Sequence, residues 1–124
     1  MIDFKNGAVI KLTKIKKPVN TELILPLLIA GEEIIDEYSA LRDFVIFTNK
    51  RLIVVNVQGL TGAKKDFTSL PYSKIQAFSV ETAGTFDLDS ELELYFSGMG
   101  KIKLDFSGST NIREIGRFIG EQIL

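Results

Sequence analysis

The stretch Arg42–Val57, RDFVIFTNKRLIVVNV, decides how the rest of the sequence folds. Two runs of apolar, β-branched and aromatic residues flank Asn49 and Lys50. This predicts a β-hairpin with these two residues in its loop and Asn49 at a positive-φ turn position. The predicted cross-strand pairs are Thr48 with Arg51, Phe47 with Leu52, Ile46 with Ile53 and Val45 with Val54.

Both faces of this hairpin are apolar. Directly opposed residues share a face, so one face carries Val45, Phe47, Leu52 and Val54 and the other carries Phe44, Ile46, Ile53 and Val55. A strand with one solvated face would alternate, so the hairpin needs cover on both sides. The domain core supplies one cover, and a helix or another subunit supplies the other. We predict the face of Phe44, Ile46, Ile53 and Val55 as a homo-oligomer interface; which face belongs to the core stays open.

Composition limits the available chemistry. A chain of 124 residues with 45% apolar content predicts one domain with a single core. The 15 basic and 16 acidic residues nearly cancel, so we expect no nucleic acid partner. Without cysteine or histidine, disulfides, zinc sites and histidine acid–base chemistry are excluded, and no cofactor is expected. No apolar run approaches membrane-spanning length, so the cytoplasm is the expected compartment.

The amino-terminal part is less regular. Residues 1–18 have no clear period, and both a short strand at 10–14 and a basic amphipathic turn fit the pattern. A short helix is expected to begin at Asn20 or Thr21 and to be kinked or split by Pro26. Its apolar residues, which are the best candidates to cover one face of the hairpin, are Leu23, Ile24, Leu27 and Leu28.

The remainder predicts consecutive strands and a final helix. Besides the central hairpin, strands are expected near 34–40, 65–70, 74–81, 91–96 and 101–106. In the last hairpin, Phe96 is predicted opposite Ile102, with the loop Gly98-Met99-Gly100. The helix is expected from Asn111, which forms a capping box with Glu114, to about Ile123. Its buried stripe is predicted to be Ile112, Ile115, Phe118, Ile119 and Ile123.

These elements predict a mainly β domain, a bent seven-stranded antiparallel sheet or partly open barrel capped by the carboxyl-terminal helix. Residues 1–31 form an amino-terminal extension and helix, and residues 32–124 form the barrel and its capping helix. The segments TNKRLIVV, QGLTG and FSVETAGTFDLDSELEL occur in this order. With them, the sequence from about Leu23 to the carboxyl terminus resembles the bacterial pleckstrin-homology-like domain family.

This resemblance implies the same capped barrel, an amino-terminal helix packed outside it, and ring-like homo-oligomers. Phosphoinositide binding in eukaryotic relatives is an analogy of fold, which does not carry function. Those relatives hold the phosphates with a basic loop between their first two strands. The corresponding connection here, residues 39–42, has Arg42 as its only basic residue.

Two further groups of residues are candidates for binding. Asp87, Asp89 and Glu91 have a period of two, so an extended backbone would place three carboxylates on one face as weak candidates for a calcium or magnesium site. Basic residues that could contact anionic lipid are Lys50, Arg51, Lys64 and Lys65, with Lys11, Lys14, Lys16 and Lys17 nearer the amino terminus. A solvated surface is the simpler explanation of each group, and the sequence favours it over both kinds of site.

The sequence thus favours a non-enzymatic binding or scaffolding module that self-associates and presents its loops or an open sheet edge to a protein or peptide partner. Recognition of an anionic membrane surface is the alternative. Metal-dependent activity at the acidic run is the least favoured.

Overall fold

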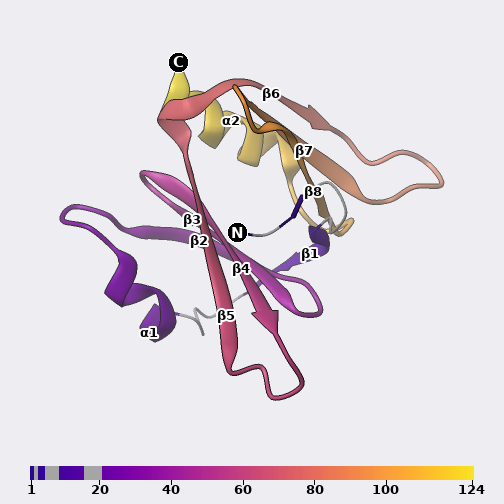
Figure 1. Ribbon diagram of the computed structural model, residues 1–124. Helices are drawn as coiled ribbons and strands as arrows, with labels where there is room; N and C mark the ends of the chain where they lie inside the picture. Colours follow the sequence, from indigo (N-terminus) through magenta and orange to yellow (C-terminus); the bar gives the residue numbers. More distant parts are fainter. Residues whose placement is uncertain (2, 5–8, 16–20) are drawn as a thin grey trace.

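β-Strands are the main secondary structure of the chain, and two helical segments cover them (Figure 1). The computed structural model describes residues 1, 3–4, 9–15 and 21–124. Its strands are β1 (Val9–Lys14), β2 (Ile34–Ser39), β3 (Asp43–Thr48), β4 (Arg51–Gln58), β5 (Lys64–Pro71), β6 (Ile75–Glu81), β7 (Ser90–Phe96) and β8 (Gly100–Phe106). Its helical elements are α1 (Thr21–Ile24), the 3₁₀ turns η1 (Leu25–Leu27) and η2 (Tyr72–Lys74), and α2 (Ile112–Ile123).

All of these strands belong to one bent sheet with the order β5-β4-β3-β2-β1-β8-β7-β6. The predicted class, a mainly β fold capped by a carboxyl-terminal helix, is confirmed, but the sheet has eight strands instead of seven. The additional strand is β1, which lies in the stretch whose structure the sequence left open. It pairs antiparallel with β2 and parallel with β8, and so joins the two halves of the sheet.

The central hairpin, β3–β4, has the predicted register from Val45–Val54 to Phe47–Leu52. Its turn differs from the prediction, because Asn49 does not have a positive φ. Instead, Thr48 Oγ1 accepts hydrogen bonds from the amides of Lys50 (3.1 Å) and Arg51 (3.0 Å). A side-chain acceptor therefore organises the turn, without a left-handed residue.

The first face of the hairpin belongs to the main core, which α2 covers. This core includes Val45, Phe47, Leu52 and Val54 together with side chains from β7, β8 and α2. A Cβ atom at Gly116 of α2 would lie 2.9 Å from Val80 Cγ1 in β6. Glycine costs about 1 kcal/mol relative to alanine inside a helix, and here it allows the close approach of α2 to the sheet.

The amino-terminal end of α2 has the predicted cap residue, but among the described residues only one of the two hydrogen bonds of the predicted capping box is present. Asn111 Oδ1 accepts a hydrogen bond from the Glu114 amide at 3.4 Å. The predicted stripe faces the core, with Ile112, Ile115 and Ile119 buried and Phe118 and Ile123 packed against them in part. An N-cap side chain and an apolar stripe therefore fix where the helix begins and which side it buries.

The chain itself covers the second face of the hairpin. Ile46, Ile53 and Val55 are fully buried in a separate cluster with Ile24 of α1. The sequence allowed either a helix or another subunit as the cover of this face, and the structure shows the helix. The residues predicted as an oligomer interface, Phe44, Ile46, Ile53 and Val55, thus lie in or against this internal cluster. Self-association stays a prediction, and it requires another surface.

This cover consists of two linked turns, α1 and η1, as the position of Pro26 predicted. Leu27, which was expected to be buried, is exposed. The change from α to 3₁₀ winding after Ile24 moves the following side chains out of the α-helical period. The alternative helix start at Asn20 lies outside the described residues, and α1 begins at Thr21.

Arg51 fastens this cover to the hairpin. Its guanidinium binds both carboxylate oxygens of Glu32, at 2.9 Å from Nε and 3.0 Å from Nη2, and also donates to the Leu27 carbonyl. The Glu32 side chain is fully buried and also accepts a hydrogen bond from Thr48 Oγ1 at 2.7 Å. Burial raises the pKa of Glu32, but the hydrogen bonds from Arg51, Thr48 and the Ile29 amide bring it below its ordinary value. The carboxylate therefore stays charged at neutral pH.

The β7–β8 hairpin has the predicted faces but another register. Phe96 pairs with Gly100 and Leu94 with Ile102, so the prediction that Phe96 faces Ile102 is wrong by two residues. The loop is residues 97–99, with Gly98 at a φ of 80°. A shift of two residues preserves the faces of both strands, which is why the predicted apolar residues are still buried.

We predict that Arg51→Met lowers the free energy of unfolding by about 2–4 kcal/mol, because it leaves the buried Glu32 carboxylate without its partner. Urea unfolding followed by circular dichroism measures this change. The matched control is Arg117→Met, since Arg117 forms an exposed ion pair with Glu121 at 3.3 Å. The control is expected to cost about 0.5 kcal/mol or less; equal losses would contradict the role assigned to Arg51.

Candidate functional site

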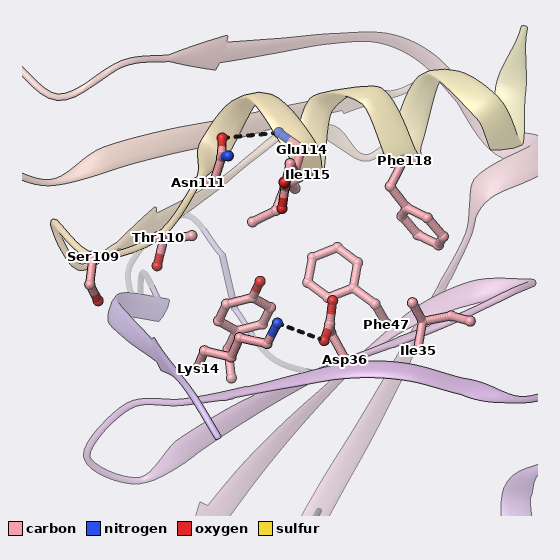
Figure 2. Close-up of a pocket in the computed structure, with 11 residues that line it drawn as sticks. Lys14, Ile35, Asp36, Phe47, Ser109, Thr110, Asn111, Glu114, Ile115 and Phe118 are labelled. Atoms are coloured by element: carbon pink, nitrogen blue, oxygen red, sulfur yellow. Dashed lines mark hydrogen bonds and ion pairs between the residues drawn. The ribbon is translucent and has the colours of Figure 1, made fainter. Parts of the chain in front are cut away.

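A pocket of about 280 Å³ lies between the sheet and the first turns of α2 (Figure 2). Strands β1, β2 and β3 form one side, and the β8–α2 connection and α2 form the other. The lining residues are Lys14, Ile35, Asp36, Tyr38, Phe47, Ser109, Thr110, Asn111, Glu114, Ile115 and Phe118. Strand register explains the sheet side, because Asp36 pairs with Phe47 and Lys14 with Tyr38.

The base of the pocket is aromatic. The rings of Tyr38 and Phe47 meet edge to face with centroids 5.7 Å apart, and those of Phe47 and Phe118 do so at 6.1 Å. Tyr38 and Phe47 are 4% and 3% exposed, so the core holds both rings in place. Aromatic pairs in this geometry attract one another. The base is therefore a preformed apolar surface.

Two hydroxyl groups at the pocket have unused hydrogen-bonding capacity. Thr110 Oγ1 is buried without a hydrogen-bond partner, and none is recorded for the Tyr38 hydroxyl within the described part of the chain. Burial raises the pKa of Tyr38 to about 12, and the negative charges of Asp36 and Glu114 act in the same direction. The phenol therefore stays protonated at neutral pH and can donate a hydrogen bond to a ligand.

The charged groups at the rim are mostly acidic. Asp36 Oδ1 forms an ion pair with Lys14 Nζ at 3.3 Å, and Glu114 lies across the pocket on α2 (Figure 2). The Asp36 side chain is 37% exposed and that of Lys14 is 59% exposed. A ligand would thus meet an apolar base, the hydroxyl groups of Tyr38, Ser109 and Thr110, and two carboxylates, one of which already holds a cation.

Comparison with known proteins identifies the family. The family model described as "Bacterial PH domain" matches residues 3–123. The chain belongs to the bacterial PH domain family. The structure is similar to that of a DUF1696 family protein with a pleckstrin-homology domain from Shewanella loihica, with a TM-score of 0.80 and 34% identity over 95% of this chain and 100% of that one. The family predicted from the sequence is thereby confirmed.

Other relatives agree with this assignment. A pleckstrin homology domain from Shewanella amazonensis matches with a TM-score of 0.65 and 39% identity over 84% of this chain and 85% of that one. The uncharacterized protein YjqA of Bacillus subtilis is 51% identical over 77 residues, or 62% of each chain. The uncharacterized protein YozO of the same organism is 31% identical over 82% of this chain and 87% of its own length.

The three acidic residues that were weak candidates for a metal site do not form one in this bacterial PH domain. Asp87 Oδ1 accepts a hydrogen bond from the Asp89 amide at 3.1 Å, which organises the β6–β7 loop. Glu91 Oε1 forms an ion pair with Lys103 Nζ at 2.8 Å on the outer face of the sheet. Throughout the described residues, no three acidic side chains are grouped in a way that could hold a metal ion.

The predicted lipid contacts lie at two ends of one strand. Lys50 and Arg51 are at the β3–β4 turn, whereas Lys64 pairs with Gln58 at the far end of β4. The rise per residue of a strand puts these two ends roughly 25 Å apart. Arg51 is engaged with Glu32, and Lys65 Nζ donates to the Gly62 carbonyl at 2.9 Å. Lys50 and Lys64 are exposed. Lipid binding by these residues stays a prediction, and they do not share one surface patch.

Of the four amino-terminal lysines named as candidate lipid contacts, two lie in the part of the chain that the structure describes. Lys16 and Lys17 lie outside the described residues. Lys11 is exposed on β1, and Lys14 belongs to the rim of the pocket. In the described ranges, no helix is long and apolar enough to cross a membrane.

The sequence alone did not reveal the pocket. Its residues come from the end of β1, from β2–β3 and from the start of α2, and no local motif connects these segments. The one available signal was Asp36 and Tyr38, a polar and an aromatic residue that share the core-facing side of β2. The helix cap at Asn111 was predicted, but not its place beside that side of the strand.

We predict that stability falls between pH 10 and about 12 in part because Tyr38 ionises in the unfolded chain while the folded state keeps it protonated. The folded state raises the pKa of Tyr38 above its ordinary value of 10.0, so this contribution is complete below pH 10 and is lost as pH rises through the folded value. Urea unfolding at a series of pH values, compared with Tyr38→Phe, measures the effect. An identical decline in the variant would show that Tyr38 does not contribute.

Proposed function

We propose that this bacterial PH domain is a non-catalytic binding module that holds a protein or peptide partner in the pocket between β2, β3 and α2. The observation that carries this proposal is a preformed aromatic base with unpartnered hydroxyl groups at its edge. Ligand sites typically combine an apolar lining with a few placed polar groups. A volume of about 280 Å³ suits one or two side chains of a longer ligand that continues across the surface.

The chemistry of the pocket favours binding over catalysis. The chain has no cysteine or histidine, so a thiolate nucleophile and a histidine general base are not available at neutral pH. Activation of Tyr38 as a nucleophile would require a lowered pKa, whereas burial and the neighbouring carboxylates raise it to about 12. Its hydroxyl group is suited to hydrogen bonding.

We predict that a displayed library of random peptides yields binders to the wild-type domain and that Glu114→Trp abolishes their binding. The indole would occupy the pocket from α2, where Glu114 is exposed and lines it. Arg113→Trp is the matched control, because Arg113 is exposed on the same helix but does not line the pocket. Binders that tolerate both substitutions would place the peptide site elsewhere.

The second part of the proposal is self-association through the outer surface of the amino-terminal cover. Three apolar side chains are exposed there: Leu25 is 54%, Leu27 39% and Ile29 60% exposed. Contiguous apolar patches on soluble proteins often mark contacts with other proteins. A closed assembly would also present several copies of the pocket to one partner and so increase avidity.

Light scattering on a sizing column is expected to give the mass of a discrete oligomer for the wild-type chain. Leu25→Glu with Ile29→Glu should reduce it to a folded monomer, because charges replace the exposed apolar groups. Leu41→Glu is the control, since Leu41 is 100% exposed in the distant β2–β3 loop. A monomeric wild-type chain would refute self-association and leave the peptide proposal intact.

A further inference from the structure

We propose, on the basis of the proposed function, that the group received by the pocket is a cation, the ammonium or guanidinium of a lysine or arginine side chain in the partner peptide. The rim carries two carboxylates, those of Asp36 and Glu114, above a base of aromatic rings. Carboxylates attract such a cation, and ring faces do so as well. The proposal thus names the ligand chemistry of the same pocket.

Backbone geometry places these groups around one point. Asp36 and Tyr38 are two residues apart on β2 and share its core-facing side, and Phe47 pairs with Asp36 on β3. Glu114 reaches the same space from the first turn of α2, opposite Asp36 and Lys14 in the pocket (Figure 2). The charges of both Asp36 and Glu114 raise the pKa of Tyr38, as expected if both lie near its hydroxyl group.

The chain already places a cation at this rim. Lys14 Nζ lies 3.3 Å from Asp36 Oδ1, and most of the Lys14 side chain is exposed to solvent. Exposed ion pairs of this kind contribute little to stability, so a ligand cation that also reaches the aromatic base can displace Lys14. In this view Lys14 is a weak internal competitor for the site.

The unpartnered hydroxyl groups provide a second, independent observation. The Tyr38 side chain is 4% exposed and lines the pocket, and its hydroxyl group forms no hydrogen bond with another group of the described residues. Thr110 Oγ1 is buried without a partner in the same pocket. Hydroxyl oxygens accept hydrogen bonds from ammonium and guanidinium groups. A cationic ligand would therefore satisfy groups that the folded chain leaves unpaired.

The positive end of α2 opposes a cation, but with a smaller charge. A helix amino terminus is equivalent to about half an elementary charge, whereas Asp36 and Glu114 carry two full negative charges. Asn111 also satisfies one of the free amides at that helix end, because its Oδ1 accepts a hydrogen bond from the Glu114 amide. The net field at the rim therefore still favours a cation, most strongly once Lys14 has moved away.

Nuclear magnetic resonance titration of the full chain with acetyl-Ala-Arg-Ala-amide tests this proposal. The arginine peptide should shift the amide signals of Asp36, Tyr38 and Glu114, and its citrulline counterpart, which keeps the shape but lacks the charge, should not. Asp36→Asn and Glu114→Gln should each weaken binding about two- to fivefold. Lys14→Gln should strengthen it by about the same factor, because the competitor is removed.

Lys101→Gln is the matched control for total charge, since Lys101 forms an exposed ion pair with Glu93 on the outer face of the sheet. It should leave the affinity unchanged. Equal binding of the citrulline peptide at the pocket, or selected library peptides without a basic residue, would overturn the cation assignment while the proposed function stands. If neither the tripeptide nor any library peptide engages the pocket, the proposed function itself fails.

Discussion

The structure depends on one constraint, a central hairpin that is apolar on both faces. Cover on one side alone would leave the other apolar face of β3–β4 exposed to water. The chain therefore covers the hairpin on both faces. Helix α2 closes the main core on one face, and α1 with η1 closes the smaller cluster of Ile24, Ile46, Ile53 and Val55 on the other. The cover formed by α1 and η1 contributes few apolar contacts of its own. The Arg51–Glu32 ion pair, with the hydrogen bond from Arg51 to the Leu27 carbonyl, therefore helps to hold it against the hairpin.

The pocket follows from the same arrangement. Helix α2 must approach β6 closely, which Gly116 allows, and its opposite end begins beside β2. The pocket lies between the sheet and this part of α2, and Tyr38, Phe47 and Phe118 form its floor. The aromatic rings that complete the core on one side therefore form the apolar base of the pocket on the other.

Local patterns predicted most elements, because hydrophobic periodicity and turn chemistry act between near neighbours. The hairpin ladder, the cap at Asn111 and the split helix at Pro26 are of this kind. Strand β1 was left open because its partners are distant, and parallel pairing with β8 leaves no mark in its own sequence. The β7–β8 register was wrong by two residues, since both registers bury the same side chains. The pocket is formed by the end of β1, by β2–β3 and by the start of α2. It could not be predicted, because no local pattern shows that these segments meet.

Electrostatics decide what such a pocket can select. The chain has a formal net charge of −1, so no long-range field guides a ligand to it. Screening at physiological salt limits the influence of Asp36 and Glu114 to about 8 Å. Selectivity must then arise at contact, where the buried rings of Tyr38 and Phe47 exclude water and strengthen each charge interaction. A protein with nearly balanced charge can therefore still discriminate by charge, provided that the acidic groups stand at the edge of an apolar base.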